Sequence, residues 1–138
     1  MANWNDATIQ EFHSKAGKGV GPFGDQLILL TTVGTRSGKE RTSPVMYHRD
    51  GEGYVVVASK GGAPDNPDWY NNLKANPVAR VEVGTATGTE TFEVRAREAE
   101  GEERERMFAD RVAIAPGFGE YQRNTSRQIP VMILERTG

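Results

Sequence analysis

Apolar side chains recur along this chain in two different patterns. They follow one another without interruption at residues 27–32 and 54–58, and they alternate with polar side chains at residues 79–83 and 91–97. Continuous apolar runs of this length are typical of strands that are buried on both faces, whereas alternation is typical of strands with one solvated face. We therefore predict two strands of each kind.

Turn-forming segments separate these strands. Glycine and small polar residues gather at residues 34–38, 50–53 and 84–88, and segments this short join antiparallel neighbours. A further apolar run at residues 131–134 follows Pro130, and proline is best tolerated at the start of a strand. The pattern favours hairpins over crossover helices and therefore predicts an antiparallel sheet.

Helical spacing appears first near the N-terminus. Ile9, Phe12 and Ala16 share one face of a short amphipathic helix, for which Asn5 or Asp6 is the expected N-cap. We expect this helix to close one end of a barrel. The alternative is a weak peripheral contact with the inner face of a membrane, although the few lysines nearby do not favour it.

Two more helices are predicted between the strands. Asn66, Pro67 and Asp68 supply an N-cap, a proline at the first helical position and an acidic residue in the first turn. A longer helical segment spans residues 100–115, where the apolar side chains form a stripe that we expect to pack on the core. Hairpins with a few helices, in a chain of this size, predict a small antiparallel barrel with helices packed on its openings.

Composition and charge fit a single globular unit. The chain has 138 residues, of which 36% are hydrophobic and 26% charged, and no linker divides it. We therefore expect one domain over residues 1–138, in which residues 1–20 form the N-terminal helix and a linker. The net charge of -2 provides no field that would attract nucleic acid, so no nucleic-acid partner is expected.

Several classes of chemistry are excluded or disfavoured. Cysteine is absent, which excludes disulfides and thiolate catalysis. His13 and His48 lie on different predicted elements without acidic residues at ligand spacing, so we expect no metal site. The chain has no Gly-x-Ser-x-Gly elbow, P-loop or Gly-x-Gly-x-x-Gly motif. Without an apolar run long enough for a signal peptide or a membrane span, we expect a cytoplasmic protein with no integral membrane segment.

Two segments have the composition of an anion-binding site. One predicted hairpin tip carries the cations Arg36, Lys39 and Arg41, and Lys60 precedes two glycines at a strand end, just ahead of a predicted helix. Arginine and lysine donors, together with accessible backbone amides, bind phosphate and carboxylate groups. An apolar slot between the segments would accept a flat ring. The sequence thus predicts a site for a phosphorylated organic cofactor within residues 31–80.

Six motifs occur in a fixed order along the chain. They are Leu-Thr-Thr-Val-Gly at residues 30–34, Ser-Gly-Lys at 37–39, Pro-Val-Met-Tyr at 44–47, Ser-Lys-Gly-Gly-Ala at 59–63, Asn-Pro-x-Trp-Tyr-x-Asn-Leu-Lys-Ala-Asn-Pro at 66–77 and Ile-Pro-Val at 129–131. With these separations the chain resembles the deazaflavin-dependent nitroreductase family. The resemblance implies a mainly β fold, an antiparallel split β-barrel of the FMN-binding, flavin-reductase type with flanking helices. It also implies binding of coenzyme F-420, a deazaflavin with a phosphate and an oligoglutamate tail.

The resemblance also implies which residues contact the cofactor. By position, Arg36, Arg41 and Lys60 look like the residues that bind the phosphate and the tail. The other implied cofactor-binding residues are Ser37, Lys39, Pro44, Val45, Met46, Val57, Ser59, Gly61, Gly62 and Asn72. The implied reaction is hydride transfer from the deazaflavin C5 to a small-molecule acceptor such as a quinone, an activated enone, a polycyclic lactone or a nitroaromatic compound.

The acceptor side is where the chain departs from the family pattern. The implied pocket residues are Met46, Ala115, Phe118 and Tyr121, and Ser59 and Tyr121 are the candidate catalytic residues because they could hydrogen-bond the acceptor. The alternative for Tyr121 is that it only packs in the lid of the pocket. Nitroimidazole-reducing members carry tyrosine at the first three of these positions, so we expect a more open and apolar pocket that favours quinone-like or polycyclic acceptors.

Two alternatives to this interpretation stay open at the level of sequence. An FMN-dependent reductase of the same fold would use the same cations for the phosphate of FMN. A non-catalytic split-barrel protein would bind the cofactor or another ligand without reducing anything. The sequence also does not choose between a monomer and a homodimer.

Overall fold

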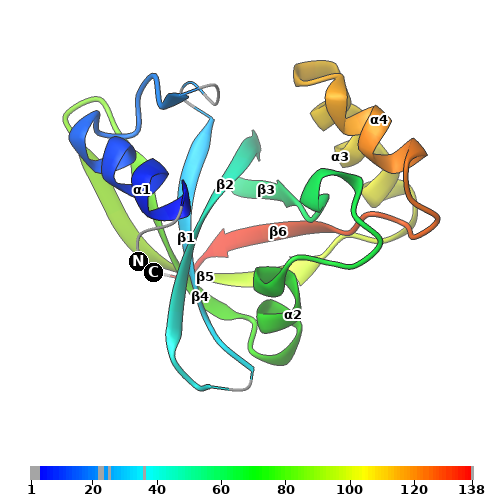
Figure 1. Cartoon of the computed structure of the whole chain (residues 1–138), viewed down its shortest axis with the longest axis horizontal. Helices are drawn as coiled ribbons and strands as arrows, with labels where there is room; N and C mark the ends of the chain where they lie inside the picture. The colour runs from blue at the N-terminus through cyan, green and yellow to red at the C-terminus, as the bar shows by residue number, and fades with distance from the viewer. Residues whose placement is uncertain (1–3, 22–23, 25, 36, 138) are drawn as a thin grey trace.

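The computed structural model describes residues 4–21, 24, 26–35 and 37–137. In this part of the chain, six antiparallel strands close into one barrel in the order β1-β2-β3-β6-β5-β4 (Figure 1). The strands are β1 (Leu27–Val33), β2 (Glu40–Asp50), β3 (Gly53–Val57), β4 (Val78–Gly84), β5 (Thr89–Glu98) and β6 (Val131–Arg136). The helices are α1 (Trp4–Ser14), α2 (Asp68–Ala75), α3 (Gly101–Ile114) and α4 (Gly117–Arg123), with a 3-10 turn η2 (Lys60–Gly62). The predicted fold class, an antiparallel split β-barrel with flanking helices, is confirmed.

The long strand β2 links the two halves of the barrel. Its residues 40–46 pair with β1 and its residues 47–50 pair with β3. The turn into β3 is only two residues long, and its Gly51 has a φ of +59°, in the left-handed region that glycine tolerates. The barrel closes where β1 pairs with β4, with Leu30 opposite Val81. The antiparallel hairpins expected from the three turn segments are therefore confirmed.

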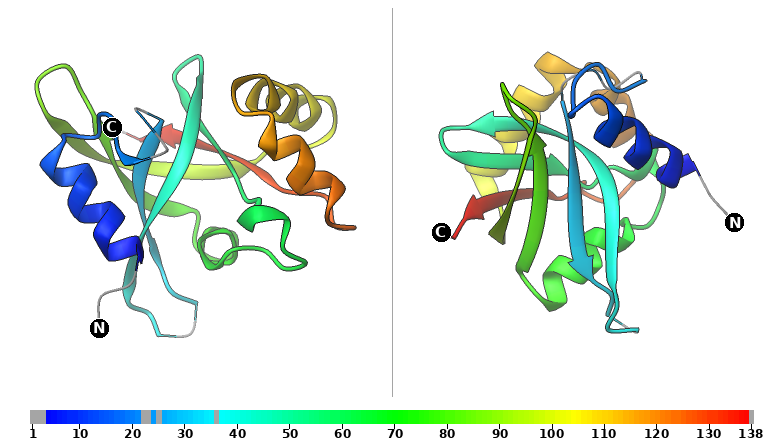
Figure 2. Two further views of the ribbon diagram at one scale, coloured as in Figure 1. Left: turned by 45° about the horizontal axis from the view of Figure 1, so that its top comes forward. Right: turned by 90° about the vertical axis from the view of Figure 1, so that its left-hand side faces the viewer.

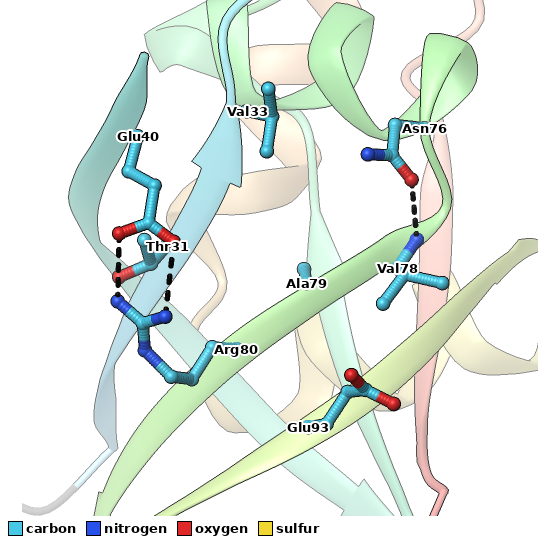
Figure 3. Close-up of a pocket in the computed structure, with 8 residues that line it drawn as sticks. All are labelled: Thr31, Val33, Glu40, Asn76, Val78, Ala79, Arg80 and Glu93. Atoms are coloured by element: carbon cyan, nitrogen blue, oxygen red, sulfur yellow. Dashed lines mark hydrogen bonds and ion pairs between the residues drawn. The ribbon is translucent and has the colours of Figure 1, made fainter. Parts of the chain in front are cut away.

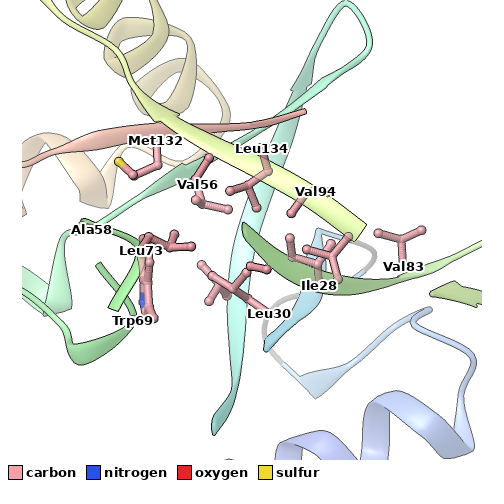
Figure 4. Packing of buried hydrophobic residues seen from close by; sticks show 14 of the residues in the cluster. Ile28, Leu30, Val56, Ala58, Trp69, Leu73, Val83, Val94, Met132 and Leu134 are labelled. Carbon is pink, nitrogen blue, oxygen red and sulfur yellow. The ribbon is translucent and has the colours of Figure 1, made fainter. Parts of the chain in front are cut away.

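The interior of the barrel holds the main core. The positions predicted to share one face of the two alternating strands all lie in it, namely Ala79, Val81, Val83, Phe92, Val94 and Ala96. Trp69 and Leu73 reach this core from α2 (Figure 4). Because Trp69 and Leu73 anchor α2 in the core, the position of this helix against the barrel is fixed.

Helices cover the outside of the barrel on two sides (Figure 2). α3 and α4 pack on β3 and β6, and the predicted stripe of the 100–115 helix, Met107, Phe108, Val112 and Ala115, lies in this second core cluster. α1 lies on the other side, where Phe12 packs against Leu27 and Leu29. Within the described residues, no helix is long and apolar enough to cross a membrane.

Several details of the helices differ from the sequence predictions. Ala16, predicted to share a helical face with Ile9 and Phe12, lies beyond the end of α1 at Ser14 and has a φ of +53°. α1 already begins at Trp4, so Asn5 and Asp6 lie in its first turn and neither is its N-cap. α2 begins at Asp68 with Pro67 as its N-cap, because the side-chain oxygen of Asn66 accepts a hydrogen bond from Arg127 instead of capping the helix. The short helix α4 was not predicted, since seven residues that include two glycines give little helical signal.

Candidate functional site

A large hollow lies between α1, the β1–β2 hairpin and α2. It is a cavity of about 870 Å³. Its lining residues are Asp6 and Ile9 from α1, Gly34, Thr35 and Ser37 from the hairpin tip, Glu40, Arg41, Thr42 and Ser43 from β2, and Asp68, Trp69, Asn71 and Asn72 from α2. The structure thus brings together three predicted cofactor-binding residues, Ser37, Arg41 and Asn72, from segments far apart in the sequence.

Asn72 fixes one wall of this cavity. Its Oδ1 accepts a hydrogen bond from the backbone N–H of Thr35 at 3.2 Å, and its Nδ2 donates to Thr32 Oγ1 at 3.0 Å. Both ends of the buried amide are therefore engaged by the β1–β2 hairpin. Asn72 holds α2 against the hairpin, and by doing so it sets the width of the cavity.

The hairpin tip is closed by short-range hydrogen bonds. The N–H of Gly34 donates to the Lys39 carbonyl at 2.8 Å, and the N–H of Lys39 donates to Ser37 Oγ at 3.1 Å. A Cβ on Gly34 would lie 2.9 Å from Ser37 Oγ, so a larger residue there would require the Ser37 side chain to shift. Lys39 and Arg41 are exposed, so an anion can reach both side chains from solvent. Arg36, the third predicted cation, lies outside the described residues.

A smaller cavity on the outer face of the barrel contains Arg80, which pairs with a carboxylate of the larger cavity (Figure 3). It has a volume of about 240 Å³ and shares Glu40 with the larger cavity. Arg80 forms two hydrogen bonds with the Glu40 carboxylate, at 3.0 and 3.2 Å, and these bonds lower the Glu40 pKa. Of the three carboxylates in the larger cavity, Glu40 is thus compensated by a cation outside it, while Asp6 and Asp68 share the cavity with Arg41.

The second predicted anion-binding segment forms the turn η2. Lys60 has a φ of +48°, a left-handed conformation that is uncommon for any residue other than glycine and is often found at functional sites. Its Nζ lies 3.0 Å from Asp65 Oδ2, which lowers the Asp65 pKa. Ser59 is buried beside it. Neither Lys60 nor Ser59 is among the residues that line the larger cavity.

The predicted acceptor-side residues come together on the outer face of the barrel. Met46, Ala115, Phe118 and Tyr121 all belong to the cluster that packs α3 and α4 on β3 and β6, and Val57 lies in it too. The rings of Phe118 and Tyr121 meet edge to face with centroids 5.3 Å apart. Tyr121 is half-buried, so its ring packs in the wall of this cluster.

Strand alternation separates the residues predicted to line the cofactor ring. Val45 points into the barrel, where it joins the main core, whereas its neighbour Met46 and Val57 of the adjacent strand lie in the outer cluster. Pro44 is half-buried. A ring on the outer face would therefore meet the side chains of Met46 and Val57, and only the backbone of Val45.

One arginine that sequence reasoning did not single out organises the loop before α2. Arg127 donates to the carbonyl oxygens of Ala58, Ser59 and Ala63, and to Asn66 Oδ1, at distances between 2.7 and 3.2 Å. These acceptors surround η2 on both sides. Because Arg127 is far from η2 in the sequence, only the folded chain shows this connection.

Two buried polar residues were also missed. Arg111 is fully buried, and among the described residues nothing accepts a hydrogen bond from its Nε or Nη1. His48, for which no metal role was expected, is buried, and burial, followed by the nearby charge of Arg111, lowers its pKa. An arginine in an amphipathic helix ordinarily indicates a solvated face, so no sequence signal pointed to this arrangement.

The sequence was compared with models of known protein families to identify the family of this barrel. The family model described as F-420H2-dependent quinone reductase matches residues 4–136. The chain belongs to the F-420H2-dependent quinone reductase family. It is thus a deazaflavin-dependent oxidoreductase, as the sequence resemblance implied, and its reductant is reduced coenzyme F-420.

Individual relatives agree with this family assignment. An F-420H2-dependent quinone reductase of Mycobacterium tuberculosis H37Rv is 35% identical over 135 residues, which cover 96% of this chain and 87% of the relative. A solved F-420-H2 dependent reductase, FDR-A, is 44% identical with a TM-score of 0.70, over 80% of this chain and 94% of that one. A solved chain described as a domain-swapped dimer is 41% identical with a TM-score of 0.73, over 92% and 91%. The family names F-420, and the FMN alternative receives no specific support.

The residues of this quinone reductase family member fit an anionic, ring-bearing cofactor. Arg41 and the hydroxyl groups of Thr35, Ser37 and Ser43 face one cavity, which suits phosphate or carboxylate oxygens. A cavity of about 870 Å³ is also within the usual size of cofactor sites. At Gly62, a Cβ would lie 2.9 Å from the Tyr121 carbonyl oxygen, so this second basic segment is packed closely against α4.

Proposed function

We propose that this protein transfers a hydride from the deazaflavin C5 of reduced F-420 to an electron-poor organic acceptor. The observation that carries the proposal is that strand β2 contributes residues both to the polar cavity and to the apolar cluster. Arg41 and Ser43 of this strand line the polar cavity, and Met46, a few residues further along the same strand, lies in the apolar cluster with Phe118 and Tyr121. One strand thus connects an anion-binding region with an apolar surface suited to flat rings.

The cofactor half of the proposed site uses the basic segments. Arg36, Ser37, Lys39, Arg41 and Lys60 would bind the phosphate and the carboxylate tail. The backbone amides at Gly61 and Gly62, the ring-facing groups of Pro44, Val45, Met46, Val57 and Ser59, and the bracing amide of Asn72 complete this half. The cofactor supplies the hydride chemistry, so the task of these residues is to hold it in place and exclude water.

The acceptor half of the proposed site lies against α3 and α4. Met46, Ala115 and Phe118 give it an apolar wall, which suits quinones, activated enones and nitroaromatic compounds. Ser59 and Tyr121 would hydrogen-bond the acceptor and hold it against the deazaflavin. Residues at this end differ from those of nitroimidazole-reducing proteins, so we expect quinone-like acceptors to react faster than nitroimidazoles.

A fluorescence titration with F-420 and FMN, side by side, tests the cofactor. We expect saturable binding of F-420 and much weaker binding of FMN. Anaerobic mixing of the protein with reduced F-420 and a quinone then tests catalysis, because oxidation of the deazaflavin restores its visible absorption. Tight FMN binding without F-420 binding would contradict the cofactor, and F-420 binding without oxidation by any acceptor would indicate a non-catalytic binding protein.

Lys60→Met tests the second basic segment. The substitution removes a charge-assisted contact with the cofactor, so we expect F-420 binding to weaken by about 1.5–3 kcal/mol, or roughly tenfold to 150-fold in Kd. The measurement is the same fluorescence titration.

Lys74→Met is the matched control for this variant. Lys74 forms a comparable surface ion pair, with Glu98 at 3.0 Å, but lies at the end of α2 away from both basic segments. Its Kd for F-420 should not change. Equal Kd values for the wild type and Lys60→Met would place the anion site elsewhere.

A further inference from the structure

Arg111 of α3 and His48 of β2 form a buried polar pair behind the acceptor-side cluster. Arg111 has 0% of its surface exposed and His48 has 8%. The Nη2 of Arg111 donates to Gln26 Oε1 at 2.7 Å. Its Nε and Nη1, and both ring nitrogens of His48, have no hydrogen-bond partner within the described part of the chain. Several N–H groups are therefore buried without an acceptor.

The two carboxylates near His48 in the described part of the chain, Asp50 and Asp110, are engaged elsewhere. Asp50 accepts two hydrogen bonds from Arg106, at 3.0 and 3.4 Å, and Asp110 lies 3.7 Å from the same arginine. An unpaired buried guanidinium is costly, because desolvation of the charge is not repaid by a counter-ion. Groups in such an unfavourable state are found where function needs them.

A second buried arginine on α3, Arg104, has the hydrogen bonds expected of a structural residue. Arg104 is 5% exposed, yet each of its nitrogen atoms has a partner. Its Nε and Nη2 donate to the Ile129 carbonyl oxygen, Nη2 also donates to Gln122 Oε1, and Nη1 donates to Glu105. On the same helix, one buried arginine is thus saturated and the other is not.

The pair adjoins the predicted acceptor pocket. The guanidinium carbon of Arg111 lies 5.1 Å from the centroid of the Phe118 ring. His48 is two residues from Met46, so the two side chains share a face of β2. Since Arg111 has no exposed surface, an acceptor would reach its guanidinium only after the side chains that cover it move aside.

We infer that Arg111, assisted by His48, forms the oxygen-binding end of the acceptor pocket and stabilises the oxyanion that hydride transfer creates. This inference rests on the proposed function. The hydride adds to a carbon atom of a quinone or enone, the electron pair of the conjugated double bond moves onto the carbonyl oxygen, and that oxygen later takes a proton from water or Tyr121. The acceptor is reduced and the deazaflavin is oxidised. Arg111 Nε–H and Nη1–H donate to the oxygen while it is anionic.

Thermal unfolding of two matched variants gives a readout that does not depend on activity. Arg111→Met replaces a buried charge, whose one hydrogen bond among the described residues is to Gln26, with an apolar side chain of similar length, so we expect the Tm to stay the same or rise. Arg104→Met removes a fully bonded guanidinium, so we expect the Tm to fall. A large fall in the Tm of Arg111→Met would overturn the inference, because it would mean that Arg111 stabilises the fold by more than its one hydrogen bond to Gln26.

Ligand binding to the cofactor-free protein tests the anionic oxygen directly. The probes are lawsone, a naphthoquinone whose acidic hydroxyl is ionised at neutral pH, and menadione, a naphthoquinone without that group. We expect the wild type to bind lawsone more tightly, and Arg111→Met to lose roughly 10- to 100-fold in lawsone affinity with little change for menadione. Arg111→Lys should recover part of the lawsone affinity. Equal losses for both quinones, or none, would overturn the inference.

Kinetics separate this inference from the proposed function. Arg111→Met should lower kcat with menadione on the order of 100-fold while the Kd for F-420 stays unchanged. If the wild type neither binds F-420 nor reduces quinones, the proposed function fails first. If the wild type does both and Arg111→Met keeps the wild-type kcat, only the role of Arg111 fails.

Discussion

Gly62 shows how a single residue joins the two halves of the candidate site. It belongs to the basic turn η2 and has a φ of +85°. A Cβ at this position would lie 2.9 Å from the carbonyl oxygen and 3.2 Å from the Cα of Tyr121. Both neighbouring atoms belong to the backbone of α4, so they cannot move aside as a flexible side chain would. A glycine here lets the proposed cofactor loop touch the acceptor-side helix.

Gly62→Ala is therefore expected to destabilise the protein and to shift α4. The strain of the left-handed conformation and the backbone contact together should lower the free energy of unfolding by about 2–4 kcal/mol. Gly51→Ala is the control, because Gly51 has a φ of +59° but a Cβ there would have no neighbour within 4 Å, so it should cost only about 1–2 kcal/mol. Urea denaturation measures both. Equal losses would show that the contact with Tyr121 has no cost.

At the scale of elements, the loop between β3 and α2 depends on a partner from the far end of the chain. Arg127 binds three carbonyl oxygens of this loop and the side chain of Asn66. Gln122 of α4 in turn donates to the Arg127 carbonyl oxygen at 2.8 Å. The basic turn η2, the loop and α4 are therefore held as one unit.

Arg127→Gln should loosen this unit. Loss of the charge-assisted hydrogen bonds would leave loop carbonyl groups without donors, so we expect a loss of about 1.5–3 kcal/mol in the free energy of unfolding and a weaker affinity for F-420. Arg97→Gln is the control, since Arg97 is an exposed arginine paired with Glu103 and Glu135, and its loss should cost about 0–1 kcal/mol. Wild-type stability and affinity in Arg127→Gln would show that the loop holds its shape without the arginine.

Several elements could be predicted from local sequence and others could not. The alternating strands β4 and β5 and the amphipathic helix α3 were predictable because each presents a clear apolar face. α4 was not predictable, because its seven residues include two glycines and Phe118 packs it onto α3 and β6 only in the folded chain. The N-cap of α2 was predicted one residue too early for the same kind of reason, a tertiary hydrogen bond to Asn66.

At the scale of the whole molecule, buried and surface charges respond to acid in two different pH ranges. Burial lowers the pKa of His48, and hydrogen bonds from arginines lower the pKa values of Asp50 and Glu103. In each case the unfolded state binds protons more readily than the folded state, so stability falls as the pH falls. Protonation of the carboxylates lowers stability below about pH 4, whereas protonation of His48 lowers it below the ordinary histidine pKa of about 6.5.

The Tm should therefore decrease between about pH 7 and pH 5, before the carboxylates are protonated. His48→Leu removes the group responsible, so this first decrease should disappear while the loss at lower pH remains. Thermal scans of the wild type and the variant at a series of pH values measure both effects. A decrease of the same size in His48→Leu would assign the effect to another group.

The sequence by itself determined the local pattern and the family of this protein. Strand and helix periods, turn glycines and ordered motifs are properties of neighbouring residues, and they sufficed for an antiparallel barrel that uses F-420. Only the tertiary structure decided which side chains meet. The hydrogen bonds of Asn72, those of Arg127 and the burial of Arg111 beside His48 each join segments distant in the chain. Their energies depend on burial and on hydrogen-bond partners that exist only after folding.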